Sequence, residues 1–436
     1  MTSSTISRSI EAIVGTEHLE ENPGITLDGH SPALLVRPGS HEEVRECLKV
    51  CSESNLAVVP AGLMSWIESG NPLSRADVLL SLARMARIID YSPADLTVVV
   101  EAGLTIKELY RATEPERQWL PLDPPGASRS TVGAVASCAS SGPLRLGFGT
   151  PRDYVIGLRL AHADGTESKS GGRVVKNVAG YDMNKLYIGS FGTLAIITGL
   201  TFKLRPLPDS SSTIIAPSQN LRPLVEAARG ILAMDLMPVS VLLAKGVYKN
   251  DAGSRSGEWV LAIRLIENET AVSYQKDRIE EILGSNASYS SLAGDLERAL
   301  WDKIADIDNL GEVCIKISLP LSEVLQASEN MISSVAGCAA SVDAGVGIIR
   351  LAFDAEERRA IEIIKRLRAE AFALGGTLVI ERASTDVRQQ ADAWGDLGPT
   401  ASIMKSIKDK LDPQTILSPG RFDRGIQRAR TEDDLL

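Results

Sequence analysis

The sequence predicts an α+β protein of two main domains, and three observations lead to this fold class. A strand–helix–strand pattern occupies residues 33–61. Strand-like segments then follow one another to about residue 205, with few helices between them. Beyond a polar boundary at residues 206–213, amphipathic helices and strands alternate. This alternation predicts an antiparallel sheet with two helices packed on one face.

Size and composition agree with this fold class and exclude several kinds of function. The chain has 436 residues, 44% of them apolar, which is enough for a sizeable core. Its net charge of −10, with acidic and basic residues interleaved, argues against a nucleic acid partner. No apolar run reaches the ~20 residues that span a bilayer, and the N-terminus lacks an apolar signal region. Five scattered cysteines fit a reducing compartment, so we expect a cytoplasmic protein that meets a membrane only through partner subunits.

Local patterns predict the elements of the first domain, which we expect to span residues 25–205. The apolar segment 33–38 is typical of a strand, and residues 41–54 have the apolar spacing of a helix. Ser40 is a good N-cap for that helix, with Glu43 as its capping-box partner. Further strands are expected at 56–62, 77–82, 87–92, 97–103, 155–165 and 193–208, and helices at 105–114 and from 128.

The second domain is expected to span residues 206–382. A helical segment at 383–425 would then return to the first domain, and a disordered tail at 426–436 would follow it. The helix in that segment is stopped by Asp412 and Pro413. Helices are expected at 221–233, 273–283, 322–335 and 355–376, and strands at 213–218, 240–245, 258–266, 313–320 and 347–353. No internal repeat is evident in the sequence.

Glycine-punctuated polar segments in the first domain point to a ligand. The richest is 172–196, where glycines alternate with Lys, Asn, Tyr and Asp side chains that a buried segment would not tolerate without partners. Backbone wrapped around a large polar cofactor explains this density, and an ordinary Gly-rich connection between strands is the alternative. Residues 58–72, 120–134 and 140–158 are further candidate ligand loops, and the second contains a helix N-terminus suited to an anion.

The motifs in these segments carry a specific resemblance. They read PLDPPG, SGPLRLGFGTPRDYVIGL, GGRVVKNVAGYDMNKLYIGSFGTL and, near the C-terminus, LDPQTILSPGRF. In order and spacing they resemble the type-4 FAD-linked oxidases of the vanillyl-alcohol-oxidase/PCMH superfamily, and within it the FAD-binding E subunits of bacterial glycolate oxidases. The resemblance covers residues 30–205 and 376–425. No GxGxxG or GxxxxGK[ST] motif is present, so the sequence does not support a Rossmann or P-loop fold.

This resemblance implies a PCMH-type FAD-binding domain of two α/β subdomains with a ferredoxin-like α+β cap. It implies non-covalent FAD, because no His or Cys lies in the phosphate loop or in 172–196. For Arg152 and Asp182, an internal ion pair or cap is the alternative to an FAD contact. The cofactor-binding residues that it implies are Gly62, Ser65, Pro125, Gly126, Thr131, Gly133, Ser137, Ser141, Gly142, Arg152, Asn177, Gly180, Tyr181, Asp182, Ile196 and Ile197.

The phosphate loop departs from the family pattern. The family reads P-R-G-G-G-T, whereas this chain has Pro-Ala-Gly-Leu-Met-Ser at residues 60–65. A side chain at a position with positive φ costs about 1–2 kcal/mol, and Leu63 and Met64 would crowd the pyrophosphate. Either the loop takes another path and still donates amides, or affinity for FAD is weakened or lost.

Catalytic relatives in this family place histidines, often with a metal ion, in the cap and C-terminal segment. The four histidines here all lie at or before His162, and the corresponding C-terminal stretch reads VIERASTDV, so a metal-assisted imidazole base in the cap is excluded and no metal site is expected. Arg350 and Arg382 could bind a substrate carboxylate, with a structural ion pair as the alternative use. Catalytic residues therefore stay unassigned.

Three functional hypotheses follow. The first is an FAD-binding accessory subunit of a glycolate oxidase-type complex, acting on a small hydroxy acid with a catalytic flavoprotein subunit and an iron–sulfur subunit. The second is a stand-alone flavin-dependent 2-hydroxy acid oxidoreductase that uses a non-histidine base. The third is a flavin-free structural subunit of the same complex.

Overall fold

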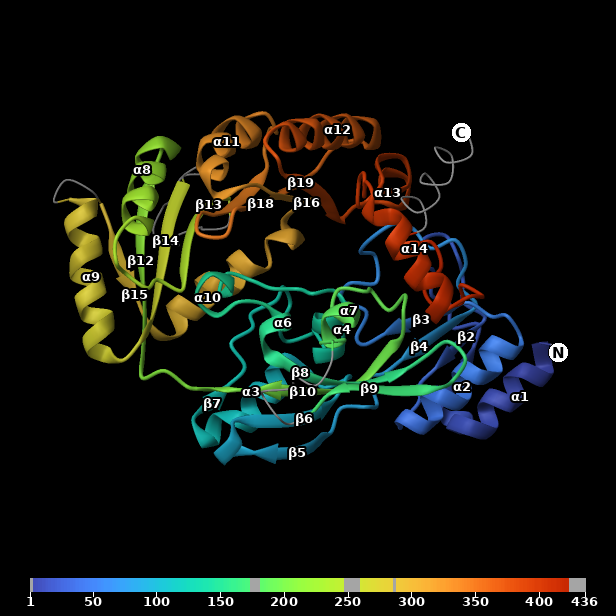
Figure 1. Cartoon of the computed structure of the whole chain (residues 1–436). Helices are drawn as coiled ribbons and strands as arrows, with labels where there is room; N and C mark the ends of the chain where they lie inside the picture. Colours follow the sequence, from blue (N-terminus) through green and yellow to red (C-terminus); the bar gives the residue numbers. More distant parts are fainter. Residues whose placement is uncertain (1–2, 173–180, 247–258, 285–287, 423–436) are drawn as a thin grey trace. The chain divides into compact units, whose positions relative to one another are not determined.

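A computed structural model describes residues 3–172, 181–246, 259–284 and 288–422, and the chain divides into two compact units (Figure 1). Unit 1 comprises residues 1–140, 150–206 and 396–436, and unit 2 comprises residues 141–149 and 207–395. The expected boundary near 205 is therefore close to the division at 206/207. Unit 2 also includes residues 141–149, which we expected in the first domain, and residues 383–395, which we expected in the C-terminal segment.

Unit 1 contains a small, mostly parallel sheet with the order β1-β2-β4-β3. Its strands are β1 (Leu19–Glu21), β2 (Leu34–Val36), β3 (Val58–Ala61) and β4 (Val78–Ser81), of which β1 alone runs antiparallel to its neighbour. Helix α2 (His41–Glu53) connects β2 to β3 and packs against α1 (Ser3–Val14). The predicted N-cap is confirmed, because the Ser40 side chain accepts from the Glu43 amide. The Glu43 carboxylate accepts from the Gly39 amide and not from the Ser40 amide, so the second bond of the predicted capping box is displaced by one residue.

The second sheet of unit 1 is antiparallel, with the order β5-β6-β10-β8-β9. It consists of β5 (Ile88–Ser92), β6 (Thr97–Glu101), β8 (Val155–Ala161), β9 (Glu167–Gly171) and β10 (Ile196–Lys203). Helices α3 (Ile106–Thr113) and α4 (Val132–Ser137) follow β6, and both begin at threonine N-caps as the sequence indicates. The remaining elements of this unit are α6 (Pro151–Tyr154), α7 (Asn184–Tyr187), β7 (Gln118–Trp119) and β11 (Arg205–Pro206).

The C-terminal segment is fastened to unit 1 by a buried ion pair. Helix α14 (Thr400–Leu411) ends at Asp412, as predicted, and Leu417 then forms a parallel bridge with Val58 of β3. The Lys408 Nζ donates to the Asp412 carboxylate at 2.6 Å and to the carbonyl oxygens of Thr193 and Leu417. Asp412 is fully buried, and its carboxylate also accepts from two backbone amides. One ion pair thus joins α14, the loop before β10 and the edge of the first sheet.

Unit 2 is an eight-stranded antiparallel sheet with the order β15-β12-β14-β13-β17-β18-β16-β19. Its strands are β12 (Ser210–Ser218), β13 (Ser240–Lys245), β14 (Trp259–Glu267), β15 (Ser290–Leu292), β16 (Val313–Ser318), β17 (Ala339–Asp343), β18 (Ile348–Phe353) and β19 (Thr377–Arg382). Each half has the order of a ferredoxin-like βαββαβ unit, and the halves join where β13 pairs with β17. The cap is therefore two ferredoxin-like units in tandem, a repeat of topology that the sequence does not display.

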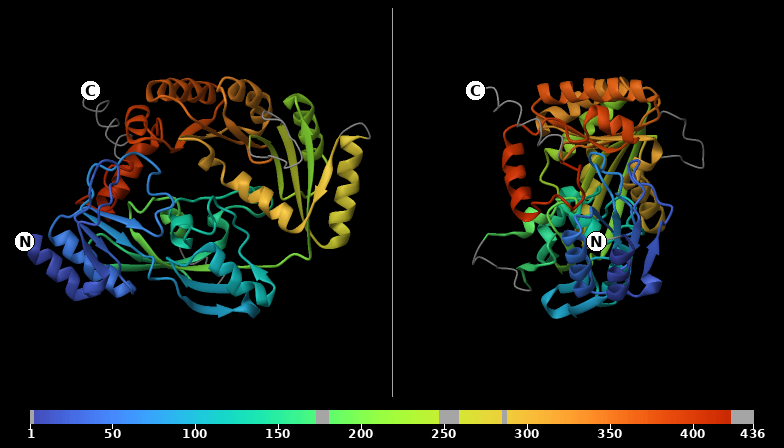
Figure 2. Two further views of the ribbon diagram at one scale, coloured as in Figure 1. Left: turned by 180° about the vertical axis from the view of Figure 1, so that it is seen from behind. Right: turned by 90° about the vertical axis from the view of Figure 1, so that its right-hand side faces the viewer.

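Helices cover both faces of this sheet, in contrast to the single covered face expected from the sequence (Figure 2). Four helices share one core with it: α8 (Leu221–Leu232), α9 (Glu269–Leu283), α11 (Leu321–Ser333) and α12 (Glu357–Ala373). On the opposite face, α10 (Gly294–Ala305) buries Leu300, Trp301 and Ile304 against β12–β14. The expectation of two helices on one face was wrong, because the sheet has eight strands where five were expected, and its larger area is covered by helices on both faces. Helices α5 (Arg145–Phe148) and α13 (Thr385–Ala391) complete the unit.

Within the described residues, we find no helix with both the length and the apolar character needed to cross a membrane.

We predict that Asp412→Ala lowers the free energy of unfolding of unit 1 by about 3–5 kcal/mol, because it leaves the buried Lys408 ammonium without its counter-charge. Urea unfolding followed by circular dichroism measures the change. The matched control is Asp409→Ala, which breaks an exposed ion pair with Lys405 on the same helix and should cost less than about 0.5 kcal/mol. Equal effects of the two substitutions would show that the buried pair has no special role.

Candidate functional site

A crevice within unit 1 lies where four parts of the chain meet. It encloses about 740 Å³, open mouth included. Its walls come from residues 59–69 after β3, from 131–138 around α4, from 191–197 before β10, and from Ser418 and Arg421 near the C-terminus.

Two glycines beside the crevice occupy positions where the segments approach too closely for a side chain. A Cβ atom on Gly62 would lie 2.3 Å from Thr131 Oγ1, and one on Gly133 would lie 2.6 Å from the Ala102 Cβ. Real Cβ atoms essentially never make such contacts, so glycine is required at both positions. Backbone thus forms the wall at these two glycines, whereas side chains such as those of Trp66, Phe191 and Ile196 line other parts of the crevice.

The loop after β3 offers unused hydrogen-bond donors. Among the described residues, none accepts a hydrogen bond from the backbone amides of residues 62–66. Four of these five residues, all but Leu63, line the crevice. The Ser65 hydroxyl donates to the Arg129 carbonyl oxygen at 2.7 Å and thus ties the loop to the segment before α4. A run of free amides at a loop is the arrangement that binds phosphate groups.

The two side chains that replace family glycines leave this crevice open. Met64 has φ of 62°, so the strain foreseen for a side chain at a lost glycine is present there. Leu63 is 47% exposed and does not line the crevice, whereas Met64 is 43% exposed and does. Phe191 and Ser418, which also line the crevice, have positive φ as well. Strained backbone gathers in this way at functional sites.

The structure brings together seven of the residues that the sequence implicates: the crevice is lined by Gly62, Ser65, Thr131, Gly133, Ser137, Ile196 and Ile197. Thr131 is the N-cap of α4, and its side chain accepts from the Ala134 amide.

The other implicated residues do not line the crevice. Pro125 and Gly126 lie in the preceding turn, where the Pro125 carbonyl oxygen accepts from the Ser130 hydroxyl. Arg152 donates to the Ile188 carbonyl oxygen and lines a different pocket of unit 1. Tyr181 is 95% exposed, and Asp182 pairs with Lys185 at 3.7 Å, which is the ion-pair alternative considered for it. Ser141 and Gly142 belong to unit 2, and Asn177 and Gly180 lie outside the described residues.

The implicated set lacks two crevice residues of the C-terminal segment, Ser418 and Arg421, and it covers Trp66 and Phe191 only through the candidate segments 58–72 and 172–196. The buried Arg421 guanidinium donates to Asp28 at 3.0 Å and to the Asn71 carbonyl oxygen at 2.9 Å, and so holds the loop that closes this side. The motif LSPGRF contains Ser418 and Arg421, so the signal was present. Because this motif is far from the phosphate loop in sequence, the sequence did not indicate that the two lie side by side in the fold.

Unit 2 holds a dense cluster of charged side chains on β16, β18 and β19. The Arg350 Nε donates to Glu381 at 3.0 Å, and the Lys316 Nζ lies 3.2 Å from the other oxygen of that carboxylate. Arg350 also reaches the Ser141 carbonyl oxygen at 3.4 Å, and Arg382 donates to the Asp308 and Gly311 carbonyl oxygens. Both arginines considered for carboxylate binding are thus engaged within the unit.

Two carboxyl groups of this unit have pKa values raised toward neutral pH. Burial raises the pKa of Asp343 to about 7, partly opposed by Arg350, and burial together with Glu381 raises the pKa of Asp308 to about 6. One carboxylate oxygen of each has no hydrogen-bond partner among the described residues. Burial alone would raise the pKa of Glu381 too, but Arg350 and Lys316 lower it to about 2. Unit 2 therefore contains protonatable groups other than histidine.

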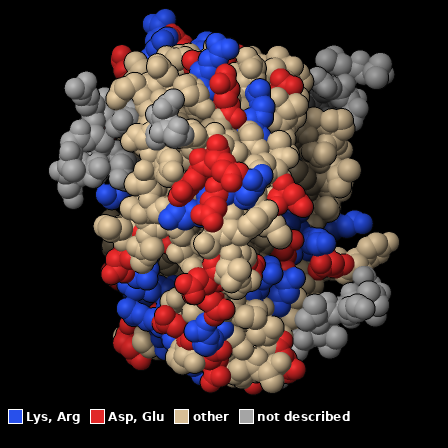
Figure 3. Space-filling view, turned by 90° about the vertical axis from the view of Figure 1, so that its left-hand side faces the viewer, with Lys and Arg blue, Asp and Glu red and all other residues tan. Residues whose placement is uncertain are grey.

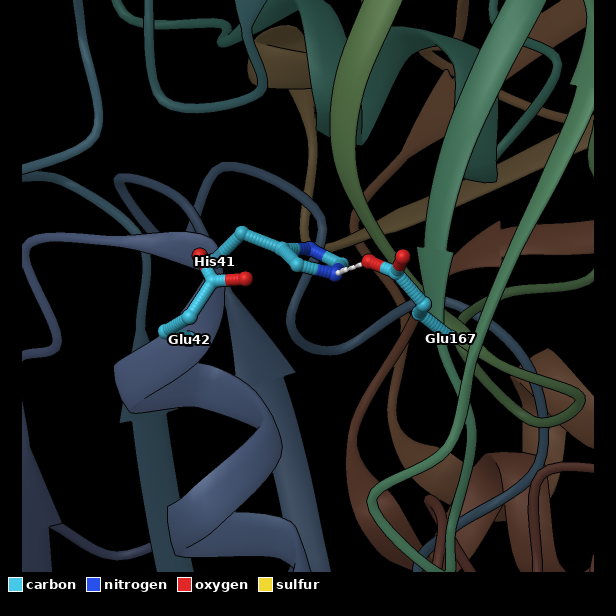
Figure 4. A group of neighbouring side chains, drawn as sticks. All are labelled: His41, Glu42 and Glu167. Carbon is cyan, nitrogen blue, oxygen red and sulfur yellow. Dashed lines mark hydrogen bonds and ion pairs between the residues drawn. The ribbon is translucent and has the colours of Figure 1, made fainter.

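One cluster in unit 1 has ligand atoms close enough for a metal ion: His41, Glu42 and Glu167 (Figure 4). The His41 ring extends from the start of α2 toward Glu167 of β9, with its Nε2 2.8 Å from the carboxylate and its Nδ1 2.7 Å from Thr198 Oγ1. The Arg159 guanidinium already pairs with Glu42 at 3.3 Å and with Glu167 at 3.2 Å. A positive charge thus lies where a cation would have to bind. We interpret the cluster as a structural link between the two sheets of unit 1.

The charge pattern of the surface agrees with the sequence analysis. On the face drawn in Figure 3, basic and acidic side chains lie interspersed rather than in one basic field. Such a face has no patch for a phosphate backbone.

Comparison with known proteins identifies the crevice region. Residues 32–171 match a family model described as an FAD binding domain. The glycolate oxidase subunit GlcD of Bacillus subtilis is 26% identical over 421 residues, covering 90% of this chain and 89% of that protein. A D-lactate dehydrogenase of Anaerostipes hadrus is 27% identical over 90% of this chain and 89% of its own. FAD as the cofactor of this domain is thereby confirmed.

Solved structures confirm the predicted fold. A p-cresol methylhydroxylase with substrate bound superposes with a TM-score of 0.76 at 17% identity, covering 97% of this chain and 96% of that one. An alkyldihydroxyacetonephosphate synthase gives a TM-score of 0.71 at 16% identity, over 96% of this chain and 86% of that one. The α+β fold is thus that of the PCMH-type oxidases.

We predict that Gly133→Ala lowers both stability and cofactor content, because the added Cβ would lie 2.6 Å from the Ala102 Cβ and push α4 away from β6. Overpacking of this kind costs about 1–3 kcal/mol. Thermal unfolding and the flavin content of the purified variant measure the two effects. Gly230→Ala is the control, because its new Cβ would make only an ordinary 3.5 Å contact inside helix α8. Wild-type stability and flavin content in Gly133→Ala would contradict the close-packed crevice.

We predict that His41 makes unit 1 less stable as the pH falls below about 6.5. Burial and then Arg159 lower the pKa of His41, so the folded ring stays neutral at a pH where a free histidine would bind a proton. The unfolded chain binds a proton first as the pH drops through 6.5, which favours unfolding. His41→Gln should therefore show a smaller loss of urea midpoint between pH 7 and pH 5.5 than the wild type. His18→Gln, at a site where the ring pairs with Glu17, is the control. An unchanged slope in His41→Gln would contradict a buried neutral ring.

Proposed function

We propose that the chain is an FAD-linked oxidase of the vanillyl-alcohol-oxidase/PCMH superfamily, and that it is the FAD-binding subunit of an oxidoreductase acting on a small 2-hydroxy acid. One observation carries the proposal. Within the region that matches an FAD binding domain, five consecutive backbone amides have no hydrogen-bond acceptor among the described residues, and four of these five residues line the crevice.

The residues present fit FAD. The amides of residues 62–66 would receive the pyrophosphate, and the small residues Gly133 and Ser137 leave room beside it. Ile196 and Ile197, at the start of β10, give the crevice a buried apolar wall. Bound FAD supplies the two-electron acceptor that no side chain offers. The protein's own part is to bind this group, orient it and keep water out.

Oxidation of a hydroxy acid also needs a cation for the carboxylate and a base for the hydroxyl proton. Unit 2 has no histidine, so the family's imidazole base has no counterpart there. Arg350 and Arg382 are engaged in the unit, and the described carboxyl groups of Asp343 and Asp308 have pKa values raised to about 7 and about 6. These arginines and carboxyl groups of unit 2 favour an accessory role over independent catalysis.

We therefore place the chain in an assembly of the glycolate oxidase type. The similarity to a protein named as a subunit of glycolate oxidase supports this placement. A catalytic flavoprotein subunit and an iron–sulfur subunit are the partners that the proposal requires. The chain would relay electrons between them or complete the assembly.

The proposal predicts that the purified chain carries about one non-covalent FAD, visible as the absorption of an oxidised flavin. Acid precipitation should release all of the flavin into the supernatant. This readout matters because Cys138 lines the crevice and is the residue there that a covalent link would use. A colourless chain that cannot be reconstituted with FAD would leave only the structural hypothesis.

Anaerobic addition of glycolate or D-lactate distinguishes the two catalytic hypotheses. The chain alone should keep its flavin absorption, and bleaching should need the reconstituted complex. Bleaching of the isolated chain would contradict the accessory role and support a stand-alone oxidoreductase.

A further inference from the structure

Unit 1 contains a second pocket that the proposed function does not use. It encloses about 760 Å³, open mouth included, between the segment 185–194 and helix α14. It shares Ser418 with the FAD crevice and lies against other residues of the loop before β10.

One side of this pocket is apolar. Leu186 and Leu194 come from the segment around α7, and Met404, Ile407 and Phe422 from α14 and the chain after it. These side chains come from parts of the chain more than 200 residues apart, so the wall depends on the tertiary fold. An apolar chain of several carbons would gain by burial against them.

The rest of the lining is cationic or neutral. Arg152 and Lys185 both line the pocket, and no Asp or Glu is among its lining residues in the described part of the chain. The one carboxylate paired with Lys185, that of Asp182, is 3.7 Å away and half exposed, so this pair is weak. A ligand carboxylate could compete for the Lys185 ammonium.

A buried hydroxyl in the lining has no partner. Ser190 is 5% exposed, and among the described residues none forms a hydrogen bond with its Oγ. The neighbouring Lys408 is not a hydrogen-bond partner of this hydroxyl, because its ammonium donates to Asp412, Thr193 and Leu417. Unsatisfied buried hydroxyls are uncommon and call for an explanation, which a ligand oxygen would supply.

We propose that this pocket binds a small amphipathic carboxylate. The apolar tail packs against Leu194 and Ile407, and the carboxylate meets Lys185, Arg152 and the Ser190 hydroxyl. A metal cation is excluded because the lining lacks carboxylates, and a compact polyanion would leave the apolar wall unused. The site is separate from the oxidation of substrate and does not depend on it.

Sodium octanoate is the probe, measured against the full-length chain by isothermal titration calorimetry. We expect a dissociation constant of about 0.1–1 mM, typical of a ligand of this size. Octan-1-ol, which keeps the tail without the charge, and acetate, which keeps the charge without the tail, should each bind at least about tenfold more weakly. Failure of octanoate to bind, or equal binding of octanol, overturns the proposal.

Two variants locate the site. Lys185→Gln should weaken octanoate binding about fivefold. Ser190→Ala should weaken it by a similar factor yet leave the melting temperature of the free protein unlowered, because no internal hydrogen bond is lost. Lys410→Gln, which removes an exposed lysine of α14 outside the pocket, is the control. Octanoate binding that is unchanged in both variants, with flavin content equal throughout, means that the probe binds elsewhere and overturns the proposal.

Discussion

The close approach of Gly62 to Thr131 is the constraint on which the site depends. It brings the end of β3 in the first sheet against the N-cap of α4, which follows a strand of the second sheet. Because no Cβ fits between them, the residues on either side present main-chain groups to the space that is left. The crevice thus forms where the two sheets of unit 1 approach each other at Gly62.

Contacts made by the C-terminal segment also close the crevice. The buried Lys408–Asp412 pair holds α14 to the Thr193 carbonyl oxygen, and the bridge from Val58 to Leu417 carries the chain on to Ser418. Each of these contacts joins residues that are distant in sequence. We therefore expect cofactor binding in unit 1 to depend on its C-terminal segment, although that segment lies outside the residues that match the FAD binding domain.

Local chemistry could be predicted from the sequence, whereas the meeting of distant segments could not. The cap of α2 at Ser40, the N-cap of α4 at Thr131 and the stop at Asp412 each depend on a few adjacent residues, and all three predictions are confirmed. The tandem cap was missed because β13–β17 pairing joins two halves without sequence similarity. Arg152 was assigned to the cofactor by motif position, yet it lines another pocket.

The central claim is that amides 62–66 bind the cofactor's pyrophosphate despite Leu63 and Met64. A crystal structure of the chain grown with FAD tests it most directly. Our account predicts phosphate oxygens about 2.9 Å from these amide nitrogens, the ordinary N–H···O distance, with Met64 beside them. A crevice filled by the Met64 side chain, or a flavin bound outside it, would contradict the account.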